Sequence, residues 1–282
     1  MKISIVTINY NNYLGLERTL KSVQEQKNAT YESVVIDGGS NDKSTDVIKN
    51  YKSIITSSVS EADNGVYQAM NKGIKIAKGE YLLFLNSGDY FYDDTSLSKI
   101  LKELDGTDLI AFNINMYNSK INIIYKHPEK LSSYYLFDET LAHQSVLIKR
   151  DLFKKYGLYD ENLLVVSDWK FFLKAAISGC TYKNHDQIIT KFEYGGISST
   201  AEGVRIRKKE REVVLKEDYA FFYDDYKLLK KQKELLSMNR FKLLLEIEKK
   251  YLGRKFLSIV LRGAVYLFSK KKLKNILNSN DS

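Results

Sequence analysis

The sequence predicts an α/β protein with a mostly parallel central sheet flanked by helices, followed by a helical C-terminal extension. Short apolar runs with sharp polar ends alternate with segments of helical periodicity in the first half of the chain. The repeated order of strand and helix implies parallel strands joined by right-handed crossovers. Apolar residues make up 44% of the 282 residues, which is enough for a globular core.

The first half contains the clearest elements. Strands are expected at residues 3–8, 34–36, 54–55 and 80–85. Apolar residues at helical spacing predict helices over Leu16–Val23, Val47–Tyr51 and Val66–Ala77. Ser44 is expected to cap the second of these helices. Tyr81–Leu85 is a continuous apolar run, which is typical of a strand buried on both faces.

The second half is less regular. Further strands are expected at residues 109–113, 121–125, 145–149 and 188–192. One helix is expected after the capping residue Thr95. A second is expected over Asp151–Tyr156 and ends at Gly157, and a third follows the capping residue Ser167 and ends at Gly179. Gly195–Ser199 is predicted to be a mobile loop, and the chain from Val204 onward is mostly helical and charged.

The positive charge is confined to one segment. Residues 239–274 contain eleven Lys or Arg and two acids, Glu246 and Glu248, which accounts for the whole net charge of +9. This asymmetry favours a neutral catalytic body with a basic tail over a nucleic-acid-binding protein. We therefore expect no nucleic acid among the partners.

Several function classes lack their sequence signatures. The single cysteine, Cys180, excludes an intramolecular disulfide and fits a reducing compartment. The three histidines form no zinc pattern with it. No signal peptide is recognisable at the N-terminus. The first strand is followed by neither a dinucleotide-binding glycine motif nor a P-loop, which argues against a Rossmann dehydrogenase and a P-loop NTPase.

Polar clusters follow three of the predicted strands, at Thr7–Asn11, Asp37–Asp42 and Asn86–Asp89. Parallel strands present such clusters at one edge of the sheet, where open α/β sheets bind ligands. The amide, hydroxyl, glycine and carboxylate of Asn86–Asp89 suit a hard metal ion and a diphosphate. The alternative is a plain turn, because the same residue types are favoured there.

The sequence resembles the inverting glycosyltransferases of family 2, which have the GT-A fold. The matching stretches are Ile3–Asn11, Val35–Asp42, Asn71–Gly73, Phe84–Asp89, Gly157–Glu161 and Ser167–Trp169. Together they cover roughly residues 1–200. The form of the Asp37–Ser40, Glu61–Tyr67 and Asn86–Asp89 stretches resembles a subgroup found in bacterial capsule and exopolysaccharide clusters.

The resemblance implies a catalytic domain over residues 1–218, with a nucleotide-sugar-binding half at 1–113 and an acceptor-binding half at 114–218. In the first half the nucleotide pocket would be lined by Thr7, Asn9 and Tyr10, with Tyr10 against the base. Asp37 would accept a hydrogen bond from uracil N3–H while staying partly solvated at the rim. The alternative for Asp37 is a turn-forming residue before two glycines.

The sugar or diphosphate would be contacted by Asp63 and Lys72, although Lys72 could instead belong to a solvated helix face. Asp89 would be the principal ligand of Mg²⁺ or Mn²⁺, with Asn86 and Ser87 beside the donor. The family usually has Asp-x-Asp here. Because Asn86 and Gly88 replace acids, metal affinity is expected to be weaker.

The acceptor half would supply the catalytic base, Asp168, which removes the proton from the acceptor hydroxyl. The alternative is an acid that merely favours a helix N-terminus. His143 and Gln144 would contact sugar or acceptor, or His143 could be a buried, satisfied histidine. Trp169 is either a core residue or a platform for a sugar. The loop at Gly195–Ser198 could close over the donor.

The extension at 219–282 carries the basic segment. Phe256–Phe268 is apolar but has only thirteen residues and includes Arg262, so it is too short and too polar to span a bilayer. Its basic flanks fit the surface of an anionic membrane. They also fit a helix that packs on the catalytic body with a solvated basic face.

These features together predict a metal-dependent, inverting transferase that moves a sugar from a UDP-sugar to a saccharide or a lipid-linked saccharide. We expect it in bacterial surface polysaccharide synthesis, in the cytoplasm at the inner face of the cell membrane. One alternative is a non-catalytic module that binds sugar nucleotides or polysaccharide, because two acids are missing from the metal motif. A nucleotidyltransferase is less favoured, because no glycine-rich phosphate loop with Arg or Lys follows the first strand.

Overall fold

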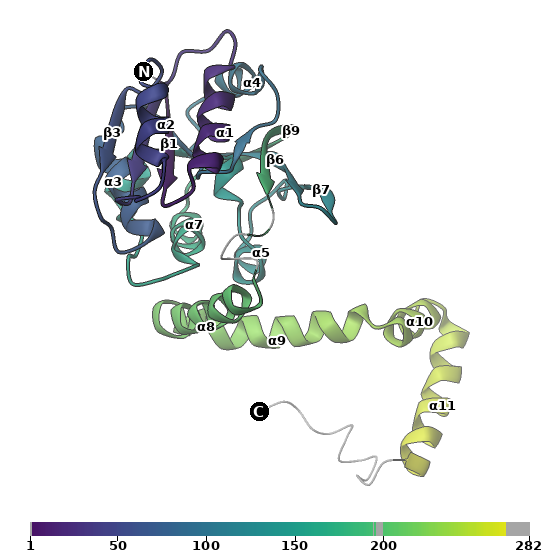
Figure 1. The fold of residues 1–282 in the computed structure, drawn as a ribbon. Helices are drawn as coiled ribbons and strands as arrows, with labels where there is room; N and C mark the ends of the chain where they lie inside the picture. Colours follow the sequence, from purple (N-terminus) through teal and green to yellow (C-terminus); the bar gives the residue numbers. More distant parts are fainter. Residues whose placement is uncertain (1, 194, 196–199, 269–282) are drawn as a thin grey trace. The chain divides into compact units, whose positions relative to one another are not determined.

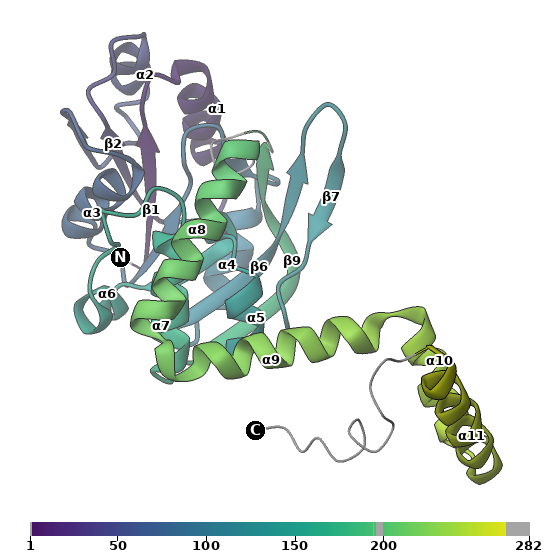
Figure 2. The ribbon, with the colours of Figure 1, turned by 90° about the horizontal axis from the view of Figure 1, so that it is seen from below.

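The computed structural model describes residues 2–193, 195 and 200–268. The chain divides into two compact units, Met1–Tyr219 and Ala220–Ser282. The first unit contains the sheet with its covering helices, and the second is helical (Figures 1 and 2). The catalytic and membrane roles expected for residues 1–218 and 219–282 stay predictions.

Within the described residues, nine strands form one sheet in the order β3-β2-β1-β4-β8-β6-β9-β5, with β7 paired to β6. The strands are β1 (Ile3–Asn9), β2 (Glu32–Asp37), β3 (Ser57–Ser60), β4 (Tyr81–Phe84), β5 (Tyr90–Phe91), β6 (Leu109–Tyr117), β7 (Asn122–Tyr125), β8 (Val146–Lys149) and β9 (Tyr182–Glu193). Strands β3, β2, β1 and β4 are parallel to one another, and β8 is antiparallel to both of its neighbours, β4 and β6. The predicted α/β class is confirmed.

The centre of the sheet is covered on both faces. Every residue of β1, β2 and β4 is buried, as the apolar run Tyr81–Leu85 predicts. Helix α3 (Val66–Ile76) packs against β1 and β2. The approach is close at Gly73, where a Cβ atom would lie 2.4 Å from Cγ1 of Val6. A side chain at this position would therefore push the helix off the sheet.

The remaining helices of the first unit are α1 (Tyr13–Gln24), α2 (Ser44–Asn50), α4 (Ser96–Lys102), α5 (Ser133–Asp138), the 3-10 turn η1 (His143–Ser145), α6 (Asp151–Tyr156), α7 (Ser167–Ile177) and α8 (Ala201–Asp218). Helix α5 and strand β5 were not predicted. With six and two residues respectively, they are too short to show a recognisable hydrophobic period. Strand β9 extends beyond the expected residues 188–192 at both ends.

Several local predictions are wrong. Ile54–Ile55 lies before β3, which starts at Ser57 because that is where the register with Val34 of β2 begins. Ser44 and Ser167 are the first residues of their helices, not caps, and their hydroxyl groups accept hydrogen bonds from Asn9 and Asp160. Thr95 occupies a cap position but its hydroxyl donates to Asp93 instead.

The described part of the second unit, residues 220–268, contains α9 (Ala220–Ser237), α10 (Asn239–Glu248) and α11 (Tyr251–Phe268). Along the described part of the chain, no helix combines the length and the apolar character needed to cross a bilayer. Helix α11 nevertheless exposes large apolar side chains along its length, such as Leu252, Phe256 and Ile259. Apart from Gly195, the loop predicted at Gly195–Ser199 lies outside the described residues.

Candidate active site

A cavity of about 580 Å³ lies beyond the carboxyl end of β4. Six of the predicted site residues line it: Asn86, Ser87, Asp89, His143, Gln144 and Asp168. They come from three separate parts of the chain, namely the turn after β4, the turn η1 and the first turn of α7. The fold therefore brings the expected metal side and the expected acceptor side to one space, as parallel sheets do at this edge.

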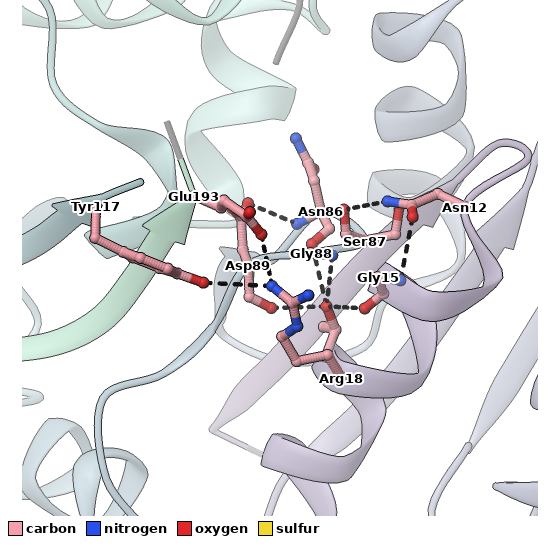
Figure 3. Close-up of polar contacts among 10 residues, drawn as sticks. Asn12, Gly15, Arg18, Asn86, Ser87, Gly88, Asp89, Tyr117 and Glu193 are labelled. Atoms are coloured by element: carbon pink, nitrogen blue, oxygen red, sulfur yellow. Dashed lines mark hydrogen bonds and ion pairs between the residues drawn. The ribbon is translucent and has the colours of Figure 1, made fainter. Parts of the chain in front are cut away.

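The turn Asn86–Asp89 is held in shape by a threonine that the sequence did not single out. The hydroxyl of Thr19 on α1 lies 2.7 Å from the carbonyl oxygen of Asp89 and accepts the Gly88 N–H at 2.9 Å. Gly88 has φ = +109°, where an L side chain would be strained. Figure 3 shows the turn residues Ser87, Gly88 and Asp89 together with the Asn12 amide, which donates to the carbonyl oxygen of Ser87 at 3.0 Å.

Asp89 is a buried carboxylate at the base of this turn. The residue is only 5% exposed, and its Oδ2 atom accepts a hydrogen bond from the Asn86 N–H at 3.1 Å. Burial raises the pKa of Asp89 to about 7, against the opposing effects of His143, the Asn86 N–H and Gln144. A cation bound beside Asp89 would favour its ionised form, because it would offset the cost of burying the negative charge.

Asp168 is also buried but is held in its charged form. The hydroxyl of Tyr67 donates to Oδ1 at 2.9 Å, and Nδ1 of His143 lies 3.1 Å from Oδ2. Burial alone would raise the pKa of Asp168, yet the hydrogen bonds from His143, Tyr67 and the backbone N–H of Trp169 in the first turn of α7 lower it. A carboxylate facing the cavity is therefore available at neutral pH.

Tyr67 was missed as a site residue. It lies in the first turn of α3, inside the Glu61–Tyr67 stretch on which the resemblance partly rests, and it is not among the apolar residues whose spacing predicted that helix. Burial and the negative charge of Asp168 both raise the pKa of Tyr67, so its hydroxyl stays a donor. The signal in the sequence was a tyrosine, instead of an aliphatic residue, two residues after the polar turn Asp63–Gly65.

His143 connects the two carboxylate sides. Its Nε2 lies 3.3 Å from the Asn86 amide nitrogen and accepts a hydrogen bond from that amide. The ring proton is therefore on Nδ1, which donates to Oδ2 of Asp168. The Oδ1 atom of Asn86 is buried and has no hydrogen-bond partner among the described residues. His143 is thus neither isolated in the core nor fully solvated, and it forms a continuous polar path from Asn86 to Asp168.

A divalent cation fits this site only with help from a ligand. In residues 2–193, 195 and 200–268, no group of three or more His, Cys, Asp or Glu side chains is placed to hold a metal ion. The buried Asp89 carboxylate and the unpaired Oδ1 of Asn86 nevertheless provide two oxygen donors of the kind Mg²⁺ and Mn²⁺ prefer. Phosphate oxygens and water would have to complete the coordination.

The residues expected around the nucleotide lie outside this cavity. Asp37 is fully buried, and its two carboxylate oxygens accept four hydrogen bonds from Asn9, Ser40 and Ser60. Burial opposes these bonds, yet the pKa of Asp37 is lowered because the bonds prevail. The expectation that Asp37 is partly solvated is wrong, since these three residues surround its carboxylate with hydrogen-bond donors.

Thr7 is buried too, and its hydroxyl has no partner among the described residues, whereas Tyr10 is 66% exposed. Asp63 lies against Gly38, where a Cβ atom would come within 2.6 Å of its carboxylate. Lys72 is not a free solvated residue, because its ammonium group pairs with Glu61 at 2.9 Å. Contacts of these residues with a donor stay predictions.

Trp169 takes the core alternative. The residue is 1% exposed, and its indole N–H donates to the carbonyl oxygen of Leu136. Glu193, which lines the 580 Å³ cavity, forms a 2.6 Å ion pair with Arg18, whose guanidinium also contacts the Tyr117 hydroxyl at 3.3 Å (Figure 3). This rim cluster was not predicted, because it joins the middle of α1 to the last residues of β6 and β9, which are far apart in the sequence.

Comparison with known sequences identifies relatives of the chain. A family model described as glycosyl transferase family 2 matches residues 4–163. A protein named as an uncharacterized glycosyltransferase from Mycobacterium tuberculosis is 30% identical over 205 residues, which cover 71% of this chain and 78% of that protein. A PGL/p-HBAD biosynthesis glycosyltransferase from Mycobacterium bovis is 28% identical and covers 70% of this chain and 79% of its own length.

Solved structures share the fold. S. aureus TarS in complex with UDP-GlcNAc superposes with a TM-score of 0.62 at 18% identity, covering 77% of this chain and 67% of that one. This chain spans 61% of a second structure of the same TarS fragment and 40% of a longer form. A mannosyltransferase from Pyrobaculum calidifontis with GDP-Man and Mn²⁺ superposes with a TM-score of 0.56 at 13% identity, covering 96% and 88%. The expected GT-A type of fold is therefore confirmed.

Proposed function

The chain belongs to glycosyl transferase family 2, and we propose that it transfers one sugar from a UDP-sugar to a saccharide or lipid-linked saccharide, with inversion. One observation carries this proposal: an ionised Asp168 and the oxygen donors Asn86 and Asp89 line the same 580 Å³ cavity. A cavity of this size suits a small ligand such as a sugar diphosphate. The UDP-GlcNAc complex of the TarS neighbour supports the choice of donor.

In this proposal Asp168 is the general base. Its carboxylate takes the proton of the acceptor hydroxyl while the hydroxyl oxygen forms a bond to the anomeric carbon. The bond from that carbon to the diphosphate oxygen breaks on the opposite face, which inverts the configuration. Tyr67 and His143 hold Asp168 ionised and oriented, so the base is ready before the acceptor arrives.

Asp89 and the Asn86 amide oxygen would hold the divalent cation on the donor side. When bound, Mg²⁺ or Mn²⁺ would neutralise charge on the leaving diphosphate. The Mn²⁺ in the mannosyltransferase neighbour supports this choice. Thr19 contributes by fixing the turn that carries both ligands.

For the second unit we propose a place on an anionic membrane surface, at the cytoplasmic side of a bacterial cell membrane. Helix α11 has no acidic residue, carries Arg254, Lys255 and Arg262, and exposes large apolar side chains. Such helices bind in the interface plane of anionic bilayers. A lipid-linked acceptor in surface polysaccharide synthesis would be found there.

A non-catalytic sugar-nucleotide-binding protein remains a second candidate. It is favoured by the replacement of two acids by Asn86 and Gly88 and by the absence of three clustered metal ligands among the described residues. It would bind the donor as the transferase does but would not consume it. Release of UDP from a bound UDP-sugar therefore separates the two.

A binding screen of nucleotide sugars with and without Mn²⁺ tests the proposal. We expect a UDP-sugar to bind at least about tenfold more tightly with Mn²⁺, which corresponds to about 1.4 kcal/mol. Asp89→Ala should remove this difference, and Asp94→Ala should keep it, because Asp94 only pairs with Lys27 at the surface. Equal Mn²⁺ dependence in the Asp89→Ala variant would refute the assigned metal role.

A further inference from the structure

A second cavity, of about 160 Å³, adjoins the first at Asp168. The two share His143, Gln144 and Asp168 as lining residues. The second cavity is lined by apolar side chains such as Ile114, Met116 and Leu141, and by two arginines of α8, Arg207 and Arg211. Nothing in the proposed transfer of the sugar uses these arginines.

Helix α8 is anchored to a neighbouring part of the chain, and one of the two arginines, Arg211, is held in a defined position. The carboxylate of Glu210 accepts the N–H groups of Leu164 and Val165 at 2.7 and 3.0 Å, and Val214 and Leu215 are buried. Arg211 donates through Nη1 to the carbonyl oxygen of Asp138, and its guanidinium lies 4.8 Å from the centre of the Trp169 ring. The cavity wall is therefore a packed surface.

The charges of this wall are incompletely paired. Arg207 and Arg211 are four residues apart on α8, a spacing at which like charges face each other and destabilise a helix. Among the described residues Arg207 has no hydrogen bond or ion pair, and Nε of Arg211 is buried without a partner. Burial and the neighbouring Arg207 both lower the pKa of Arg211, against the opposing charges of Asp168, Glu139 and Asp138.

We propose that Arg207 and Arg211 form an anion-binding subsite on the acceptor side of Asp168, which takes a phosphate or carboxylate group of the acceptor. Guanidinium groups match such oxyanions through paired N–H donors. The apolar walls strengthen the attraction by lowering the local dielectric constant. The volume is far above the roughly 10–15 Å³ that one water needs, so an oxyanion group fits.

That the bound anion belongs to an acceptor rests on the proposed function, whereas the binding of an oxyanion by the two arginines does not. With its anionic group between the arginines, an acceptor would have a neighbouring hydroxyl directed toward Asp168, because both cavities meet there. Anchoring of this kind converts binding energy into orientation. The site then prefers a charged acceptor over a neutral saccharide.

The test measures binding of methyl phosphate and of acetate by titration calorimetry at constant ionic strength, in separate runs with and without UDP and Mn²⁺. We expect saturable binding of one or both anions to the full chain, weakened at least tenfold by Arg207→Gln. The matched control is Lys209→Gln, which removes one charge from an exposed position of the same helix and should change affinity less than twofold.

The two anions distinguish the source of the charge, since preference for methyl phosphate indicates a phosphate acceptor and preference for acetate a carboxylate acceptor. Absence of saturable binding, or equal affinity in wild type and Arg207→Gln, would overturn the subsite. Arg207 makes no bond that the fold needs among the described residues, so its variant should fold, and Arg207→Lys should restore part of the affinity. Binding of UDP is read in the same runs, so a failure of donor binding is seen separately from a failure of the subsite.

Discussion

Replacement of Tyr67 by phenylalanine tests how the charge on Asp168 is maintained. The change removes only the hydroxyl that donates to Oδ1 of Asp168 at 2.9 Å. A hydrogen bond to a charged group contributes about 1.5–3 kcal/mol, and one pKa unit corresponds to about 1.36 kcal/mol. Because the bond favours the ionised form, its loss raises the pKa of Asp168. The acidic limb of the kcat/KM profile should therefore move up by about one to two pH units.

The assay is the pH dependence of UDP release from the UDP-sugar selected in the binding screen. The matched control is Tyr159→Phe, because the Tyr159 ring lies 5.7 Å from that of Tyr67 and its buried hydroxyl has no hydrogen-bond partner among the described residues. The control should keep the acidic limb of the wild type. An unmoved limb in Tyr67→Phe, or an equal movement in both variants, would refute the reasoning.

Three further predictions concern the turn, the buried acid and the tail. Thr19→Val leaves the Gly88 N–H and the Asp89 carbonyl group without their hydroxyl partner. The free energy of unfolding, measured by urea titration, should therefore fall by about 1–3 kcal/mol. An unchanged free energy of unfolding would show that water replaces the hydroxyl. Asp89 has a pKa of about 7 when folded and about 3.9 when unfolded, so between these values the unfolded chain binds fewer protons. The metal-free protein should therefore lose up to about 4 kcal/mol of stability as pH rises from about 4 to 7, and an unchanged slope in Asp89→Asn would contradict this. Deletion of residues 239–282 should abolish co-sedimentation with anionic vesicles, and equal binding by the shortened protein would exclude the tail as the anchor.

The sequence predicted the part of the fold that depends on local pattern. Within the buried run Tyr81–Leu85, residues Tyr81–Phe84 form a strand that is buried on both faces, because its neighbours in the sheet are largely apolar. Ile54–Ile55 is equally apolar but is not a strand, since pairing with β2 is made by Ser57–Ser60. Register with a partner strand is a tertiary property, and two apolar residues do not encode it.

The site was predictable where a motif marks it. Asn86, His143 and Asp168 line one cavity, and the family resemblance had assigned all three. Thr19 and Tyr67 had no such mark. Their partners are 70 and 101 residues away in the chain, and at helical spacing a buried hydroxyl looks like any core position.

The error on Asp37 has the same cause. A carboxylate before two glycines at the end of a strand suggests a solvated turn. The structure instead places Asn9 and Ser60 on the two adjacent strands, at hydrogen-bonding distance from Asp37. Short polar residues that close over a charge from neighbouring strands leave no periodic signal in the sequence.

The most direct test of the central claim is UDP release from a bound UDP-sugar by the wild type and by Asp168→Asn in the presence of Mn²⁺. The substitution keeps the size of the side chain and removes its ability to take a proton. We predict a loss of activity of at least about 100-fold, the lower range for general-base catalysis, with donor affinity within about threefold of the wild type. Full activity in Asp168→Asn would contradict the account.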